Sequence, residues 1–133
     1  MSTSLTIFLG AYPQTVQELF LETLDLLDRE LPNSQQELDI PAKMLAFSYG
    51  PGYKGMICVL FPSQKGVKLS FSKGAELAKK HPLLTGSGKK TRYVEITKAL
   101  LKKKELIEII RSAKLQHQMT QGNELLIPNA KKS

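Results

Sequence analysis

The sequence predicts an α+β domain, with two amphipathic helices packed on one face of an antiparallel sheet. Apolar residues recur at three- and four-residue spacings in two long segments, residues 13–31 and 102–117, as they do in helices with one buried face. Short β-like runs, separated by glycine and proline, lie between these segments. The order of helix, several strands and helix is typical of α+β domains.

The first helix is predicted to begin at Pro13, because a proline in the first helical turn lacks only an N–H that has no intrahelical partner. Pro32 and the polar residues after it end the helix. Residues 1–12 before it form an N-terminal extension. The expected buried stripe consists of Val16, Leu19, Phe20, Leu24, Leu27 and Leu31.

Four strands are predicted after a polar connector, over residues 43–49, 55–61, 66–71 and 91–97. The second and third form a hairpin across residues 62–65. Residues 66–71 alternate between apolar and polar side chains, as in a strand with one buried face. The strand side chains expected in the core include Phe61, Phe71, Tyr93, Val94 and Ile96.

A short helix over residues 74–80 is expected to end at His81, because the residue before a proline avoids helical backbone angles. The second long helix covers residues 102–117, with Leu106, Ile109, Ile110 and Ala113 buried. Residues 118–133 are predicted to be a loosely ordered C-terminal tail. The domain proper therefore spans residues 13–117.

The composition fits a single globular domain, since 133 residues can remove about two thirds of the unfolded surface from water. We expect a cytoplasmic protein without a membrane segment, because the N-terminal apolar run is too short for a signal peptide or a membrane span. The single cysteine, Cys58, excludes an intramolecular disulfide and a multi-cysteine metal site. It stands in an apolar run and is expected to be a buried structural thiol.

The net charge of +7 hides an uneven distribution, because residues 1–42 hold seven of the 12 acids and one of the 19 bases. Such asymmetry can mark separate acidic and basic surfaces, each with its own partner. Self-association of the two surfaces, for example in a homodimer, is one interpretation. Pairing of the opposite charges within the chain is another.

The segment Thr85–Thr91 resembles the end of a phosphate-binding P-loop. A P-loop needs glycine where this chain has Leu83 and Ser or Thr where it has Lys90, and it leads into a helix. We therefore reject nucleotide hydrolysis. A weaker anion site remains possible, because glycines allow backbone N–H groups to form an anion-binding nest. Its candidate residues are Lys73, Gly86, Ser87, Gly88, Lys89, Lys90 and Arg92.

The anion could be a phosphorylated ligand or a nucleic acid. Clustered bases support nucleic-acid binding that is sensitive to salt and independent of sequence. The aromatics argue against it, because their positions suit a core better than a base-stacking platform. A solvated basic loop whose glycines serve only turn geometry is the alternative. The bases considered are Lys79, Lys80, Lys89, Lys90, Arg92 and Lys102–Lys104.

Three carboxylates, Glu18, Glu22 and Asp25, stand at i, i+4 and i+7 on the outer face of the first helix. Neighbouring carboxylates repel one another, and a hard cation relieves that repulsion through oxygen ligands. They are therefore candidate ligands for a weakly bound divalent cation. The alternative is a solvated helix face on which Arg29 pairs with Asp25. Further candidate carboxylates are Asp28, Glu37 and Asp39.

Three parts of the chain resemble the YdhG-like bacterial domains, a family of largely unknown function. They are the turn Tyr49–Lys54, the strand Val67–Phe71 with the helix Gly74–Leu77, and the loop that runs from Pro82 into Arg92 and Tyr93. The resemblance covers about residues 13–113. The chain departs from typical members in having no tryptophan before the glycine-containing turn.

The resemblance implies a frataxin-like fold, with about five strands framed by N- and C-terminal helices. One branch of the family is described as a frataxin-like iron chaperone. Our leading expectation is therefore a non-enzymatic protein that needs no cofactor and carries iron or another divalent cation weakly, with an iron-accepting protein as a partner. An anion-binding module and an interaction or scaffold protein are the alternatives.

Overall fold

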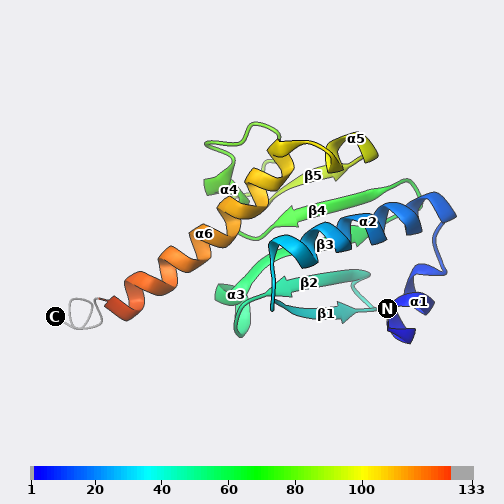
Figure 1. Cartoon of the computed structure of the whole chain (residues 1–133), viewed down its shortest axis with the longest axis horizontal. Helices are drawn as coiled ribbons and strands as arrows, with labels where there is room; N and C mark the ends of the chain where they lie inside the picture. The colour runs from blue at the N-terminus through cyan, green and yellow to red at the C-terminus, as the bar shows by residue number, and fades with distance from the viewer. Residues whose placement is uncertain (1, 127–133) are drawn as a thin grey trace.

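The computed structural model of the chain describes residues 2–126. Its α+β fold confirms the predicted class (Figure 1). The helices are α1 (Thr3–Leu9), α2 (Gln14–Glu30), α3 (Gly52–Gly55), α4 (Gly74–Leu77), α5 (Lys98–Leu101) and α6 (Lys104–Leu126). The strands are β1 (Gln35–Asp39), β2 (Met44–Ser48), β3 (Met56–Pro62), β4 (Val67–Phe71) and β5 (Arg92–Ile96).

The five strands form one antiparallel sheet in the order β1-β2-β3-β4-β5, so each strand pairs with its neighbours in the chain. Four of these strands match the predicted segments to within two residues at each end. The fifth, β1, lies in the segment predicted to be a polar connector. Its sequence, Gln-Gln-Glu-Leu-Asp, has little apolar alternation because β1 is an edge strand with mostly exposed side chains.

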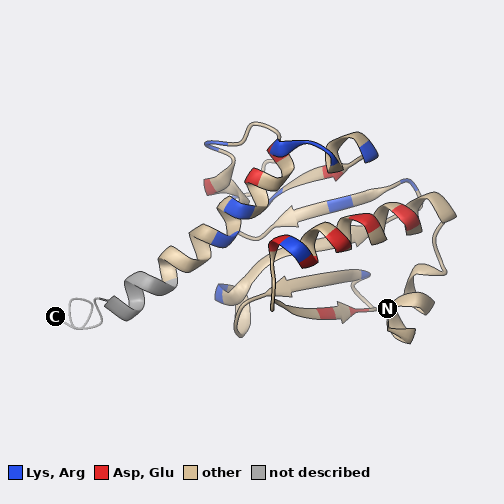
Figure 2. Ribbon diagram, viewed as in Figure 1, with Lys and Arg blue, Asp and Glu red and all other residues tan. Residues whose placement is uncertain are grey.

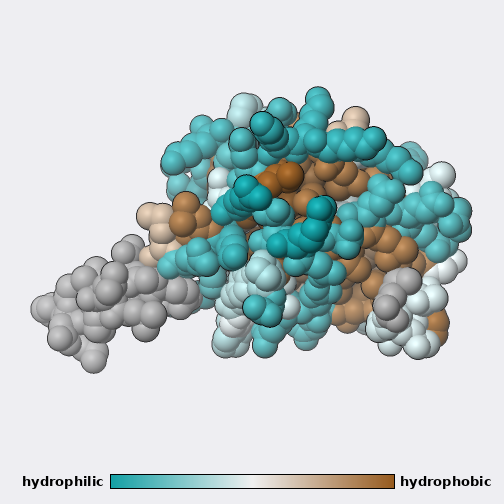
Figure 3. All heavy atoms as spheres, in the orientation of Figure 1, coloured by the Kyte–Doolittle hydropathy of each residue, from teal (hydrophilic) through white to brown (hydrophobic). Residues whose placement is uncertain are grey.

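The hydrophobic core lies between the sheet and the helices α2 and α6, which cover the same face (Figure 1). Both predicted helix stripes are confirmed, although Leu19 and Leu24 of α2 are only half-buried. The outer surface of the helix layer is mainly hydrophilic on the side shown in Figure 3. The strand side chains in this core include Leu45, Phe47, Cys58, Leu60, Val67, Leu69, Phe71, Val94 and Ile96.

Two aromatic residues predicted in the core, Phe61 and Tyr93, lie on the opposite face of the sheet. Tyr93 lies in a row with Val59 and Ser70, one residue out of step with the core side chain Val94. Phe61 shares this second face, and both rings are half-buried rather than buried in the core. Successive side chains of a strand point to opposite faces, so Tyr93 and Val94 cannot both face the helices.

The N-terminal extension is part of the folded domain. Helix α1 buries Leu5, Phe8 and Leu9 against the core, and the Phe8 ring meets Phe20 edge to face at 6.3 Å between centroids. The Ser2 side chain caps the helix by accepting from the N–H of Leu5. Apolar residues of the extension thus close one end of the space between α2 and the sheet.

The second long helix ends later than predicted. Helix α6 continues nine residues beyond His117 to Leu126, so the first part of the expected loose tail is helical. The extension is understandable, because residues 118–126 contain no proline and the next one is Pro128. The remainder of the predicted tail, residues 127–133, lies outside the described residues.

Two ion pairs join the acidic helix α2 to the basic second half of the chain. Arg111 of α6 donates to both carboxylate oxygens of Glu30, at 2.7 and 3.3 Å. Lys98 of α5 lies 3.7 Å from Glu22. The Glu30 side chain is 16 % exposed, whereas Glu22 and Lys98 are both well exposed. Part of the charge asymmetry is therefore neutralised within the molecule.

Replacing Arg111 by Gln should make stability less dependent on acid pH. The hydrogen bond from Arg111 lowers the pKa of Glu30 below its ordinary value, although burial opposes the shift. A carboxyl group whose pKa is depressed by folding contributes stability above its unfolded pKa, and the contribution is lost as pH falls through the folded pKa. Urea unfolding should show a less stable variant at pH about 7 and convergence with the wild type in acid. A Lys103→Gln control should show no such convergence; a pH-independent Arg111→Gln difference would contradict the assignment.

Candidate functional site

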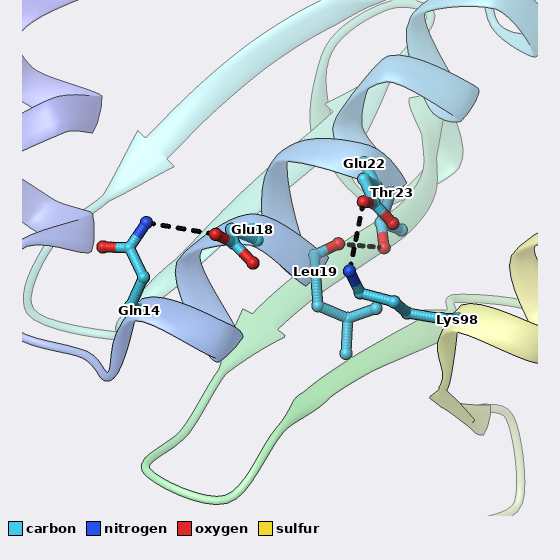
Figure 4. Close-up of polar contacts among 6 residues, drawn as sticks. All are labelled: Gln14, Glu18, Leu19, Glu22, Thr23 and Lys98. Carbon is cyan, nitrogen blue, oxygen red and sulfur yellow. Dashed lines mark hydrogen bonds and ion pairs between the residues drawn. The ribbon is translucent and has the colours of Figure 1, made fainter.

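The three predicted metal-ligand carboxylates are exposed, and acidic positions recur along the ribbon of α2 (Figure 2). Figure 4 shows that Glu18 and Glu22 engage different neighbours. Glu18 accepts a hydrogen bond from Gln14 at 3.3 Å, and Glu22 pairs with Lys98. On the buried side of the helix, the Thr23 hydroxyl donates to the carbonyl of Leu19 at 2.7 Å.

The additional candidate carboxylates are also separated. Asp28 accepts from Gln36, and Asp39 accepts from the N–H of Ala42 at 3.0 Å. Over residues 2–126, no three His, Cys, Asp or Glu side chains are grouped closely enough to hold a metal ion. The structure places the predicted ligands in one row along α2, and their use by a cation stays a prediction.

The glycine- and lysine-containing loop, in contrast, is brought together and anchored. Thr85 and Tyr93 exchange two backbone hydrogen bonds, of 2.8 and 3.0 Å, which close the loop at its base. The N–H of Ala75 in α4 donates to the carbonyl of Lys90 at 2.8 Å. Residues 86–92, hereafter the anion loop, are therefore held against the start of α4, next to Lys73.

Two glycines account for how closely the anion loop is packed. Gly86 has a φ of +114°, and a Cβ atom there would lie 3.4 Å from the Tyr93 ring. A Cβ on Gly74 would lie 2.5 Å from the backbone nitrogen of Arg92, so only glycine fits. Ser87 and Gly88 stand at the exposed tip. The glycines thus do serve loop geometry, as the solvated-loop alternative requires.

Three carbonyl groups of the anion loop accept hydrogen bonds. The Arg92 guanidinium donates to the carbonyls of Gly88 and Thr91, and the Lys90 carbonyl accepts from Ala75. These peptides are trans, and the C=O and N–H of a trans peptide point in opposite directions. The N–H groups of Lys89 and Thr91 therefore point away from these partners.

The N–H groups of Lys89 and Thr91 belong to a segment rich in positively charged residues. The N–H groups of residues 86–91 donate no hydrogen bond to any described residue. Lys89 and Lys90 are exposed, while Arg92 and Lys73 are half-buried. A basic loop with backbone N–H groups that have no partner among the described residues can hold an anion at the surface.

Tyr53 lies next to the loop, and sequence reasoning did not identify it as a neighbour. Lys90 Nζ lies 5.3 Å from the centroid of the Tyr53 ring, and the Tyr53 hydroxyl donates to the carbonyl of Ser72 at 2.7 Å. Its only sequence signal is its place in the turn Tyr49–Lys54. Nothing in the sequence connects that turn to a loop about 35 residues later.

The structure also contains a serine–histidine contact that the sequence spacing did not reveal. His81 Nε2 lies 3.0 Å from Ser112 Oγ. Ser112 stands in the middle of α6, where neighbouring backbone N–H groups are used by the helix and cannot form an oxyanion hole. The contact joins the segment after α4 to α6. His117 is buried and its ring stacks on Tyr49.

The lone cysteine is buried, as expected. Cys58 faces the core from β3, and burial raises its pKa well above the ordinary value. A thiol in this setting stays protonated at neutral pH, whereas a nucleophile requires the thiolate. Cys58 therefore contributes packing to the core.

The fold and the anion loop define a small α+β domain with a glycine- and lysine-containing surface loop. Comparison with protein-family models, with curated proteins and with solved structures finds no match to this chain. Membership of the YdhG-like family therefore stays a prediction based on the motifs. In the described part of the chain, every helix is too short or too polar to cross a membrane.

Proposed function

We propose that this protein is a binding domain whose anion loop holds an anionic group. The N–H groups of Lys89 and Thr91 would donate to the anion, and Lys73, Lys89 and Lys90 would supply positive charge. The observation that supports this most directly is that the carbonyls of Gly88 and Lys90 accept hydrogen bonds. The N–H groups of the residues that follow, Lys89 and Thr91, point away from those donors. Within the described residues these two N–H groups have no hydrogen-bond partner, so they can meet a ligand.

Arg92 has a different role from the lysines in this proposal. Its guanidinium holds the carbonyls of Gly88 and Thr91, so it sets the shape of the anion loop. Replacing Arg92 would change both the loop conformation and the charge. Lys89 and Lys90 are exposed, and their replacement removes charge with less effect on the fold. They are therefore the better residues for testing anion binding.

A Lys89→Ala, Lys90→Ala variant should bind heparin roughly tenfold more weakly than the wild type, because two exposed ionic contacts at about 0.7 kcal/mol each amount to that factor. Heparin titrations at several salt concentrations measure this, and the salt dependence should become shallower. A Lys102→Ala, Lys103→Ala variant removes the same charge from the α5–α6 turn and is the matched control. Equal losses in both variants would show a general charge effect and contradict the assigned site.

Cation carriage and self-association stay predictions. For the cation carrier, Glu22 is paired with Lys98 and Glu18 with Gln14, so neither carboxylate requires a metal to relieve repulsion. For self-association through opposite charges, the ion pairs Glu22–Lys98 and Glu30–Arg111 already join acidic and basic segments within one chain. Neither arrangement favours these functions over anion binding.

A further inference from the structure

Two tyrosine rings lie beside the anion loop. The Tyr53 ring is next to Lys90, and the Tyr93 ring is next to Gly86. On the basis of the proposed anion site, we propose that its ligand is a single-stranded nucleic acid. The phosphates would lie on the N–H groups and lysines of the anion loop, and bases would stack on Tyr53 and Tyr93. DNA and RNA share this chemistry, which is a chain of phosphates with bases free to leave the stack.

Tyr53 has the exposure and the fixed orientation that a stacking platform needs. Its side chain is an exposed aromatic, with 47 % of the residue surface accessible. The hydrogen bond from its hydroxyl to Ser72 holds the ring at one end. Lys90 Nζ, 5.3 Å from the ring centroid, places a phosphate-binding cation next to it. A base and its own phosphate could therefore meet Tyr53 and Lys90 together.

Tyr93 provides a second ring, next to Gly86 of the loop. It lies on the sheet face opposite the helix-covered core, half-buried, with Lys68 Nζ 4.3 Å from its centroid. The ring also packs against Gly86 in the anion loop. The sequence argument against nucleic acid rested on Phe61, Phe71 and Tyr93 being core residues. It holds for Phe71, which is buried in the core, but not for Phe61 and Tyr93, which lie on the opposite face of the sheet.

The exposure of the loop favours a polymer over a small phosphorylated molecule. Residues 85–91 are all exposed, whereas small-ligand sites enclose most of their ligand's surface. A polyanion can instead add many weak surface contacts along its length. A double helix would present phosphates but keep its bases stacked inside, so only a single strand can use both tyrosines.

The test measures binding by fluorescence anisotropy with labelled oligothymidylate and oligouridylate of about ten nucleotides, a DNA duplex, and heparin, which has no bases. The variant Tyr53→Leu should bind both single strands about tenfold more weakly and heparin as the wild type does. Tyr53→Phe, which keeps the ring but not the bond to Ser72, should retain most of the single-strand affinity. If the Tyr53→Leu variant loses affinity for only one of the two oligonucleotides, the proposal is still supported and that oligonucleotide identifies the ligand as DNA or RNA.

The proposal is overturned if Tyr53→Leu binds the single strands as well as the wild type, or if the wild type binds the duplex as tightly as a single strand. In both cases the Lys89→Ala, Lys90→Ala variant should still bind heparin more weakly than the wild type, because the anion site does not depend on stacking. If that lysine variant binds heparin and oligonucleotides as tightly as the wild type does, the proposed anion site itself is wrong. A Tyr93→Leu variant repeats the test at the second ring, with thermal unfolding as the check that it folds.

Discussion

The substitution Gly74→Ala should lower the free energy of unfolding by about 3 kcal/mol. A Cβ at this position would lie 2.5 Å from the backbone nitrogen of Arg92 and 2.6 Å from its Cβ. Backbone cannot yield as a flexible side chain can, so α4 and the start of β5 must move apart. The move would also strain the bond from Ala75 to Lys90 that anchors the anion loop. Urea unfolding measures the stability, and heparin titration measures the loop.

Gly66→Ala is the matched control for this prediction. Nothing lies within 4 Å of a Cβ at Gly66, which stands in the turn between β3 and β4. Its replacement should change stability by no more than about 0.5 kcal/mol, with a small gain because alanine restricts the unfolded chain. If both glycine variants were equally stable, the close contact between α4 and Arg92 would be wrong.

The substitution Phe47→Ala should lower the free energy of unfolding by about 4 kcal/mol. The Phe47 ring is completely buried, and it faces the helices from the second strand of the sheet. Its removal loses the transfer free energy of an aromatic ring and leaves a cavity that the surrounding side chains fill only in part. Chemical denaturation of the purified variant measures the loss directly.

Ile7→Ala provides the comparison for the core variant. Ile7 is 72 % exposed on α1, so its truncation should change stability by about 0.5 kcal/mol or less. A small loss for Phe47→Ala, similar to that for Ile7→Ala, would mean that the side of the sheet assigned to the core is incorrect. That result would also question the assignment of Tyr93 to the opposite face.

The fold class could be predicted because the apolar periodicities are strong in elements that bury one face and expose the other. Helix α2 and strand β4 bury regular stripes, whereas β2 and β3 are nearly continuous buried runs. The side chains of strand β1 are exposed or half-buried, so its sequence resembles a polar connector. The continuation of α6 beyond His117 is not predicted because its residues there lack an apolar repeat and include Gly122 and Asn123, residue types that often end helices.

The composition of the anion loop could be predicted, but its geometry could not. Glycines and lysines at residues 86–90 indicate a turn with positive charge. The direction of each peptide depends on Arg92 and Ala75, which contact the loop only after β5 and α4 have packed. Tyr93 was assigned to the wrong face because aromatic residues in strands are usually core residues, and the register decides the face.

The row of carboxylates on α2 shows a related limit. Helical spacing correctly places Glu18, Glu22 and Asp25 on one face. Whether carboxylates converge depends on what else reaches them, and here Lys98 arrives from α5 to pair with Glu22. Such a tertiary partner cannot be read from the helix sequence alone.

The central claim is that the N–H groups of Lys89 and Thr91 face an anion. Nitrogen–proton correlation NMR during a titration with inorganic pyrophosphate tests it directly, because each backbone amide gives its own signal. We expect the amides of Lys89 and Thr91 to shift together and to saturate, while amides within helix α2 stay unchanged. Shifts spread evenly over all lysine-rich segments, with none concentrated at Lys89 and Thr91, would contradict the account.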